Sequence, residues 1–234
     1  MVSVERVTTG IPGLDSMTEG GFKPNSNILV TGGVGTGKST FCMQYLIEGA
    51  SNGQKGIYVT FEEETHTLKD NMSRYNWNID ALEEKRLIRI IHLAPKDVMQ
   101  VVKSGYGEII NLVKDLDATR VVIDSVSSIE LMIEDDFRKR ESMLHLMTWL
   151  RKNGCTSLLV SEAEQHPSKY SRHGIVEFIV DGVIVLYNLR RQMVRQRALE
   201  ILKMRGTNHM SRIVPFIISN GIELLPRQKL FGDF

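Results

Sequence analysis

A glycine-rich loop constrains the fold of this chain more than any other feature of its sequence. Residues 32–39 read G-G-V-G-T-G-K-S, which matches the pattern G-x-x-x-x-G-K-S. The loop follows the apolar run 28–30 and precedes a stretch with helical spacing that begins near Thr40. A strand, such a loop and a helix form a unit that binds the phosphates of a nucleotide, so a merely flexible glycine loop is the poorer interpretation.

Each residue type in this loop has a physical role in binding phosphate. Glycines let consecutive backbone N–H groups turn toward phosphate oxygens, and the following helix adds the positive end of its dipole. We expect Lys38 to reach the β- and γ-phosphates and the Ser39 hydroxyl to bind Mg²⁺. The residues predicted to surround the nucleotide are Gly32, Gly33, Val34, Gly35, Thr36, Gly37, Lys38, Ser39 and Thr40.

Asp124 is the second predicted part of the metal site. It ends the apolar run 121–123, and a carboxylate at the end of a buried strand is placed to hold Mg²⁺ through a water molecule. Strands often end in Asp, so this signal is weak alone. Together with the loop at 32–39 it predicts a single site for Mg²⁺ and nucleotide, with Ser39 and Asp124 as its metal-binding residues.

Three adjacent carboxylates, Glu62, Glu63 and Glu64, follow the apolar run 57–61. Their mutual repulsion is unfavourable, which calls for a structural or functional reason. A glutamate near the γ-phosphate can take a proton from the attacking water or orient it. Acidic residues also stabilise the first turn of a helix, and one is predicted to begin near Thr65. We assign Glu62 and Glu63 to catalysis and Glu64 to the helix end.

The remaining pattern predicts a single α/β domain over residues 1–234. Short apolar runs typical of strands buried on both faces alternate with stretches of helical spacing, which indicates a doubly wound, mostly parallel sheet. The predicted parallel strands lie at 28–30, 57–61, 121–123, 157–160 and 183–187, and the helices at 40–49, 101–116 and 137–152. Runs at 199–202, 214–218 and 221–225, with a hairpin turn at Asn220-Gly221, predict C-terminal antiparallel strands.

Composition limits the partners, the compartment and the metal ion that we expect for this protein. The net charge of +1 gives no global electrostatic argument for binding nucleic acid or an anionic membrane. Two cysteines far apart suit a reducing compartment, and no apolar run approaches the ~20 residues needed to span a bilayer. We therefore expect a cytoplasmic protein without membrane contact. The six histidines lack zinc-binding spacing, which leaves Mg²⁺ as the expected ion.

Three further stretches carry a family resemblance. The stretches are T-G-I-P-G-L-D at 9–15 with the glycine pair at 20–21, F-E-E at 61–63, and L-K-M-R-G-T-N-H at 202–209. They resemble stretches of the KaiC-like branch of the RecA/RadA ATPase superfamily. The likeness extends over nearly the whole chain as one KaiC-type domain. It implies a RecA-like P-loop NTPase fold, ATP as the nucleotide, and a homohexameric ring with ATP bound between neighbouring subunits.

The resemblance gives Lys203 and Arg205 a specific role. On a strand, residues two apart point to the same face, so both cations are able to reach one site. By resemblance that site is the neighbouring subunit's γ-phosphate, where they stabilise charge in the transition state, and Thr207 and His209 line the same interface. The alternative is a solvated basic edge that discourages strand pairing.

One departure from the family pattern bears on activity. Autophosphorylating KaiC domains carry adjacent Ser/Thr residues before the strand corresponding to 183–187, whereas residues 174–181 here contain no hydroxyl. We therefore predict Mg-dependent ATP hydrolysis, in a regulatory or signalling role, without self-phosphorylation.

Two alternative functions remain open at this stage. The first is a recombinase-like ATPase that binds single-stranded DNA through loops around 129–140 and 164–173. The second is an ATP-gated interaction scaffold with slow turnover. A basic segment (Arg190, Arg191, Arg195 and Arg197) could meet a partner, although a solvated loop at the ring interface is the favoured interpretation.

Overall fold

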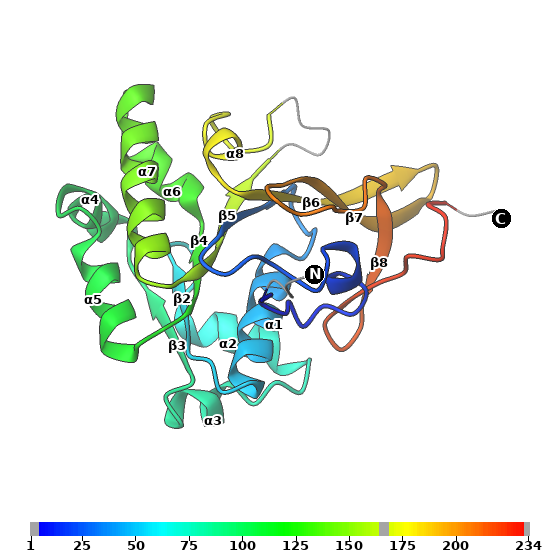
Figure 1. The fold of residues 1–234 in the computed structure, drawn as a ribbon, viewed down its shortest axis with the longest axis horizontal. Helices are drawn as coiled ribbons and strands as arrows, with labels where there is room; N and C mark the ends of the chain where they lie inside the picture. Colours follow the sequence, from blue (N-terminus) through cyan, green and yellow to red (C-terminus); the bar gives the residue numbers. More distant parts are fainter. Residues whose placement is uncertain (1–4, 164–168, 232–234) are drawn as a thin grey trace.

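The computed structural model describes residues 5–163 and 169–231, whose strands join in one nine-stranded sheet (Figure 1). The strand order is β3-β2-β4-β5-β1-β6-β7-β8-β9. The strands are β1 (Asn27–Gly32), β2 (Gly56–Thr60), β3 (Ile88–His92), β4 (Arg120–Asp124), β5 (Thr156–Glu162), β6 (Gly182–Arg191), β7 (Val194–Met204), β8 (Val214–Ile218) and β9 (Ile222–Leu224). The helices are α1 (Lys38–Ser51), α2 (Thr65–Ser73), α3 (Ile79–Glu84), α4 (Pro95–Lys103), α5 (Gly107–Leu116), α6 (Val126–Leu131), α7 (Asp136–Lys152) and α8 (Val176–Ile179), after a 3-10 turn η1 (Asp15–Met17).

The sheet has a parallel part and an antiparallel part. β1 runs parallel to both of its neighbours, β5 and β6, and β2 runs parallel to β3 and β4. β7, β8 and β9 then add antiparallel pairs at one side. The hairpin turn predicted at 220–221 joins β8 to β9, with Gly221 at a φ of +106°. The predicted α/β architecture is therefore confirmed, including its antiparallel C-terminal strands.

Two hydrophobic cores lie on opposite faces of the parallel strands. In β1, Ile28 and Val30 join the core that contains α1, α2 and α3, whereas Leu29 joins the core that contains α4 to α7. Figure 1 shows these two groups of helices on the two sides of the sheet. Because successive strand residues point to opposite faces, the middle of each inner strand must be apolar on both faces. None of the described helices is long and apolar enough to cross a bilayer.

The helix predicted over 101–116 is in fact two helices. α4 ends at Lys103 and α5 begins at Gly107, and between them Gly105 and Tyr106 adopt left-handed conformations with φ of +63° and +65°. Tyr106 N–H donates to Val101 O, which closes α4 in the manner of a helix C-terminus. Apolar spacing continues across the break, so the helical pattern alone hid it.

Three other expectations need correction. The edge strand β3 was not predicted, because Arg89 and His92 interrupt its short apolar run. The segment 129–140 is mostly helical, since α6 ends at Leu131 and α7 begins at Asp136, and it is not an open loop for DNA. Residues 164–168 of the second expected loop lie outside the described residues. The four arginines between 190 and 197 belong to the paired strands β6 and β7 and not to a loop, although Arg190, Arg191 and Arg195 are exposed to solvent as expected.

The glycine pair at 20–21 has a packing reason that can be tested. Val7 and Phe22 exchange backbone hydrogen bonds of 2.8 and 2.9 Å, and Gly21 lies against them with a φ of +127°. A Cβ at Gly21 would lie 2.3 Å from Val7 O, whereas a Cβ at Gly53, also at positive φ, meets nothing within 4 Å.

We therefore expect Gly53→Ala to lower the free energy of unfolding by about 1 kcal/mol through backbone strain alone. Gly21→Ala should lower it by at least about 2 kcal/mol, because a backbone clash adds to the strain. Urea unfolding of both variants measures the difference. Equal unfolding midpoints would contradict the close approach at Gly21.

Candidate nucleotide site

The glycine-rich loop lies between β1 and α1, at the carboxyl ends of the parallel strands. β1 ends at Gly32, and Gly37 precedes the first residue of α1 with a left-handed φ of +96°. A Cβ at Gly32 would lie 2.2 Å from Leu186 O on β6, and one at Gly37 would lie 2.8 Å from Ile218 Cδ1 on β8. Both positions therefore require glycine, and neighbouring strands hold the loop against the sheet.

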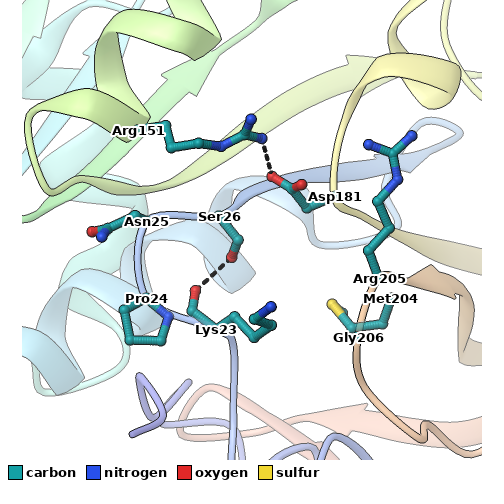
Figure 2. A pocket seen from close by; sticks show the side chains of 9 residues that line it. All are labelled: Lys23, Pro24, Asn25, Ser26, Arg151, Asp181, Met204, Arg205 and Gly206. Carbon is teal, nitrogen blue, oxygen red and sulfur yellow. Dashed lines mark hydrogen bonds and ion pairs between the residues drawn. The ribbon is translucent and has the colours of Figure 1, made fainter. Parts of the chain in front are cut away.

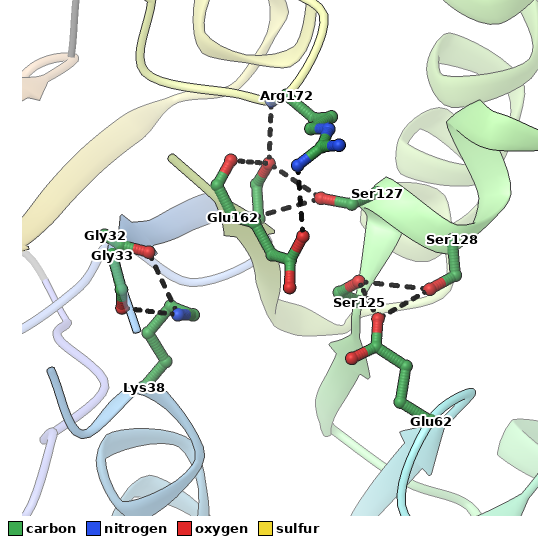
Figure 3. Close-up of polar contacts among 10 residues, drawn as sticks. Gly32, Gly33, Lys38, Glu62, Ser125, Ser127, Ser128, Glu162 and Arg172 are labelled. Atoms are coloured by element: carbon green, nitrogen blue, oxygen red, sulfur yellow. Dashed lines mark hydrogen bonds and ion pairs between the residues drawn. The ribbon is translucent and has the colours of Figure 1, made fainter. Parts of the chain in front are cut away.

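Lys38, the first residue of α1, folds back over the loop (Figure 3). Its Nζ donates to Gly32 O at 2.9 Å and to Gly33 O at 3.0 Å. Burial lowers the pKa of Lys38, and the negative charges of Asp124 and Glu162 oppose that shift. A cation satisfied only by carbonyl oxygens is ready to exchange them for the stronger acceptors of a phosphate.

Ser39 and Asp124 meet beside the loop, as predicted for a metal site. Ser39 Oγ donates to Asp124 Oδ2 at 3.1 Å, and the Tyr58 hydroxyl on β2 donates to the same oxygen. Burial raises the pKa of Asp124, while the hydrogen bonds from Tyr58 and Ser39 lower it. A carboxylate and a hydroxyl, both hard oxygen donors, fit the ligand preference of Mg²⁺.

The two glutamates after β2 point in different directions. Glu62 Oε1 accepts hydrogen bonds from Ser125 Oγ at 3.0 Å and Ser128 Oγ at 2.8 Å, at the start of α6 (Figure 3). Glu63 Oε1 instead accepts from Asn71 Nδ2 on α2. Glu62 therefore lies with the end of β4 and the residues predicted to bind metal, whereas Glu63 lies with α2.

Glu64 is the N-cap residue of α2, as its assignment to the helix end implies, but its side chain makes no cap hydrogen bond. Its carboxylate lies 3.3 Å from His92 Nδ1 on β3. The three adjacent carboxylates thus diverge toward α6, α2 and β3, which relieves the repulsion that a compact cluster would suffer.

Residues that the sequence did not assign to the nucleotide site lie around it. Tyr58, Ser125 and Ser128 orient the carboxylates, and Arg172 NH1 lies 3.6 Å from Glu162 Oε2 at the end of β5 (Figure 3). Arg197 Nε on β7 donates to Gly35 O of the loop at 3.2 Å. Hydroxyl and arginine side chains are common in any sequence. Only the fold shows that these particular ones lie beside the loop and its carboxylates.

Lys203 and Arg205 lie at the opposite edge of the sheet from the loop. Gly32 is level with Leu186 of β6 and through it with Leu199 of β7, while Ile28 is level with Gly182 and Met204. Four residues of strand, about 13 Å, therefore separate the level of Met204 from the end of β1. The cations next to Met204 are directed away from the loop of their own chain.

This cation pair, Lys203 and Arg205, is bound only to carbonyl oxygens. Lys203 Nζ donates to Glu177 O at 3.0 Å and Arg205 NH2 donates to Phe178 O at 3.2 Å, both on α8. Burial lowers the pKa of Lys203, and the positive charge of Arg205 lowers it further. Within residues 5–163 and 169–231, no carboxylate forms an ion pair with either side chain.

A cavity of about 380 Å³ borders the cation pair at this edge (Figure 2). Asp181, an acid that lines this cavity, is already engaged there, because its Oδ2 accepts from Arg151 at 2.6 Å and from Asn27 N at 2.9 Å. Arg205 lines the same cavity with its guanidinium turned away from Asp181. The positive charge of the pair thus stays available to an anion outside this chain.

Thr207 and His209 follow the cation pair in the segment after β7. Thr207 Oγ1 accepts from Arg6 NH1 at 2.8 Å, and His209 Nδ1 lies 3.2 Å from Met210 O. Both are half-buried. The structure thus separates the predicted site residues into two sets, one around the loop and one at the end of β7 and just beyond it, and does not bring them together within one chain.

The strand order, the glycine-rich loop after β1 and the carboxylate at the end of β4 define a RecA-like P-loop protein. A family model described as "ATPase: KaiC" matches residues 7–229. The chain belongs to the KaiC family of ATPases, and this membership supports an ATP-binding P-loop.

Similar proteins differ in how much of their length this chain spans. The circadian clock protein KaiC3 of Synechocystis is 32% identical over 95% of this chain, but the match covers 46% of KaiC3. The UPF0273 protein MK0039 of Methanopyrus kandleri is 36% identical over 98% of this chain and 95% of its own length. The crystal structure of the KaiC-like protein PH0186 from Pyrococcus horikoshii superposes with a TM-score of 0.85 at 40% identity, over 95% of this chain and all of that one. The chain thus spans about half of the clock relatives and nearly all of the archaeal ones.

The hydroxyl of Tyr58 provides a test of the metal site. Its hydrogen bond lowers the pKa of Asp124, so Tyr58→Phe should raise that pKa further. Binding of Mg²⁺ requires the ionised carboxylate, and affinity for Mg–nucleotide should therefore decline at a higher pH in the variant as pH falls. At alkaline pH the two proteins should bind alike.

Titration calorimetry with Mg–ATP at several pH values measures this shift. Tyr45→Phe is the matched control, because Tyr45 is equally buried and its hydroxyl donates to Thr156 O, away from any carboxylate. An acid decline that moves equally in both variants, or in neither, would count against the role of Tyr58.

Proposed function

We propose that this protein hydrolyses ATP with Mg²⁺ as a homohexameric ring in which each nucleotide lies between two subunits. The observation that carries the proposal is the placement of Lys203 and Arg205, which lie at the edge opposite their own loop without a carboxylate partner. The positive charge of the exposed Arg205 is unfavourable for the half-buried Lys203 without an anion, and a neighbour's phosphates would supply one.

Within one subunit, residues around the loop bind the phosphates and metal. Lys38 exchanges the carbonyls of Gly32 and Gly33 for phosphate oxygens, and the loop N–H groups and the start of α1 bind the remainder. Ser39 and Asp124 would hold Mg²⁺, which when bound withdraws charge from the β- and γ-phosphates.

Glu62 is the proposed base for the attacking water. Two serine hydroxyls donate to its Oε1, which leaves Oε2 to accept a proton or orient water. Glu63 contributes to the same proposed catalytic pair by anchoring α2 through Asn71, so that the turn carrying Glu62 keeps its position.

The neighbouring subunit completes the site across the interface. Lys203 and Arg205 would bind the γ-phosphate and stabilise its charge in the transition state, as an arginine finger does. Thr207 and His209, which follow on the same segment, line the interface. Each subunit offers its loop at one edge and its cation pair at the other, an arrangement that suits a closed ring of head-to-tail contacts.

A regulatory or signalling role in the cytoplasm completes the proposal. Both cysteines, Cys42 and Cys155, are buried free thiols, which suits a reducing compartment. The proposal includes no self-phosphorylation, because residues 174–181 contain no hydroxyl side chain. The exposed Phe178 of α8 lies within this segment.

Mixing two inactive variants tests the shared site. Glu62→Gln/Glu63→Gln subunits keep the cation pair, and Lys203→Ala/Arg205→Ala subunits keep the base, so each protein alone should be nearly inactive. An equal mixture should recover about one quarter of the wild-type rate of Mg-dependent ATP hydrolysis, because half of the bases and half of the cation pairs are intact and combine at random.

Light scattering and native mass spectrometry establish that the mixed subunits assemble together. Mixed rings that form and remain inactive would remove the assignment of Lys203 and Arg205 to the neighbour's site.

Absence of self-phosphorylation is tested by intact mass measurement after prolonged incubation with Mg–ATP. We expect the mass of the wild-type chain to stay unchanged while ADP accumulates. A stoichiometric gain of one phosphate per chain would overturn this part of the proposal.

A further inference from the structure

Helix α8 carries both carbonyls that hold the cation pair, yet it is only one turn long. Val176–Ile179 has no side-chain cap at Ile175, and a single turn of helix is unstable alone. The positions of the Lys203 ammonium and the Arg205 guanidinium therefore depend on the orientation of the carbonyls of Glu177 and Phe178.

Two buried side chains tie this turn to the segment before it. Ser171 Oγ accepts hydrogen bonds from Ile175 N at 3.1 Å and Val176 N at 3.3 Å, and donates to Glu177 Oε2. Glu177 Oε1 accepts from Tyr170 N at 3.0 Å. The side chains of Ser171 and Glu177 thereby close a loop of hydrogen bonds around the first turn of α8.

We propose that Ser171 and Glu177 form a clasp that positions Lys203 and Arg205 for the neighbouring subunit's nucleotide. This inference rests on the proposed function, in which the cation pair acts across the interface. Neither clasp residue touches the nucleotide, so both act through α8 as positioning residues.

The surroundings of the clasp support a positioning role over a merely stabilising one. Val176, Ile179 and Val180 already pack α8 into the hydrophobic core, which holds the turn without polar contacts. Glu130 on α6 is fully buried, and neither of its carboxylate oxygens has a hydrogen-bond partner among the described residues. Burial, followed by the charge of Glu177, raises the pKa of Glu130 to about 7.

Two buried carboxylates that repel each other are unfavourable for stability. What the clasp adds is direction. Apolar packing holds a helical turn in place but leaves its rotation loosely specified, whereas the hydrogen bonds of Ser171 and Glu177 fix which way the carbonyls of residues 177 and 178 point. The directions of these two carbonyls determine where the charged groups of Lys203 and Arg205 lie.

The clasp also joins the strand end beside the P-loop. Arg172 N, next to Ser171, donates to Ser161 Oγ at 3.2 Å, and Ser161 Oγ lies 3.2 Å from Ser127 Oγ on α6 (Figure 3). The segment that anchors α8 is thus itself fixed to the core of the subunit. Through α8, the cation pair is held in a fixed position relative to the sheet.

Ser171→Ala and Glu177→Gln test the clasp, with Ser142→Ala as a matched control that removes a hydroxyl bonded to Tyr106 on another part of the molecule. Each clasp variant should lose at least about tenfold in kcat with KM for ATP within about threefold, since only a transition-state contact is displaced. Ser142→Ala should keep its kcat.

Mixing with the two reference variants identifies which half of the site is impaired. Ser171→Ala subunits should be rescued by Glu62→Gln/Glu63→Gln subunits, which have intact cation pairs, and should not be rescued by Lys203→Ala/Arg205→Ala subunits. The opposite pattern would place the clasp in its own subunit's site, and rescue by neither would reduce it to general stability. Either result overturns the inference.

The reference mixture separates this inference from the function on which it rests. If Glu62→Gln/Glu63→Gln and Lys203→Ala/Arg205→Ala subunits fail to rescue each other, the proposed function itself fails. If they rescue each other and the clasp variants do not follow the expected pattern, only the clasp is wrong. Should Ser171→Ala fail to fold by thermal unfolding, Glu177→Gln, which keeps the volume of the side chain, carries the same test.

Discussion

The register of β1, β6 and β7 is the constraint on which the arrangement of the functional groups depends. β1 and β6 run parallel, and β7 returns antiparallel, so the segments that follow β1 and β7 emerge at opposite edges of the sheet. The P-loop follows β1 and the cation pair ends β7. The fold therefore keeps the two groups of residues apart within one chain, and under the proposed function head-to-tail contact between copies is the simplest way for them to meet.

Hydroxyl groups, and not cations, orient the carboxylates of Asp124, Glu62 and Glu177. Asp124 accepts from Ser39 and Tyr58, Glu62 from Ser125 and Ser128, and Glu177 from Ser171. A neutral donor fixes the direction of a carboxylate without cancelling its charge. The charge therefore remains for a metal ion or a proton, which a salt bridge to lysine or arginine would have reduced.

The loop at 32–39, Asp124 and most strands could be predicted because their signals are local. Continuous apolar runs and a contiguous motif need no knowledge of the fold. Apart from Ser39, which lies in the loop itself, the hydroxyl donors could not be predicted in this way, since Glu62 and Ser125 lie 63 positions apart and Tyr58 and Asp124 lie 66 apart. The break at Gly105 was missed for a different reason, because its apolar spacing on either side is in phase. Placement of Lys203 and Arg205 on one face followed from strand geometry, whereas their carbonyl partners on α8 depended on tertiary packing.

The adjacent glutamates illustrate how a short motif can divide its roles. Thr60 Oγ1 accepts from Glu63 N at 3.1 Å and donates to Glu63 O at the same distance, which pins the turn after β2. With the backbone so held, consecutive side chains must diverge, and Glu62 faces α6 while Glu63 faces Asn71 on α2. A base needs a fixed position relative to the phosphate more than it needs a second carboxylate beside it, because a like charge nearby opposes the ionised form. The geometry therefore supports Glu62 as the residue that meets water, with Glu63 holding the turn on which that meeting depends.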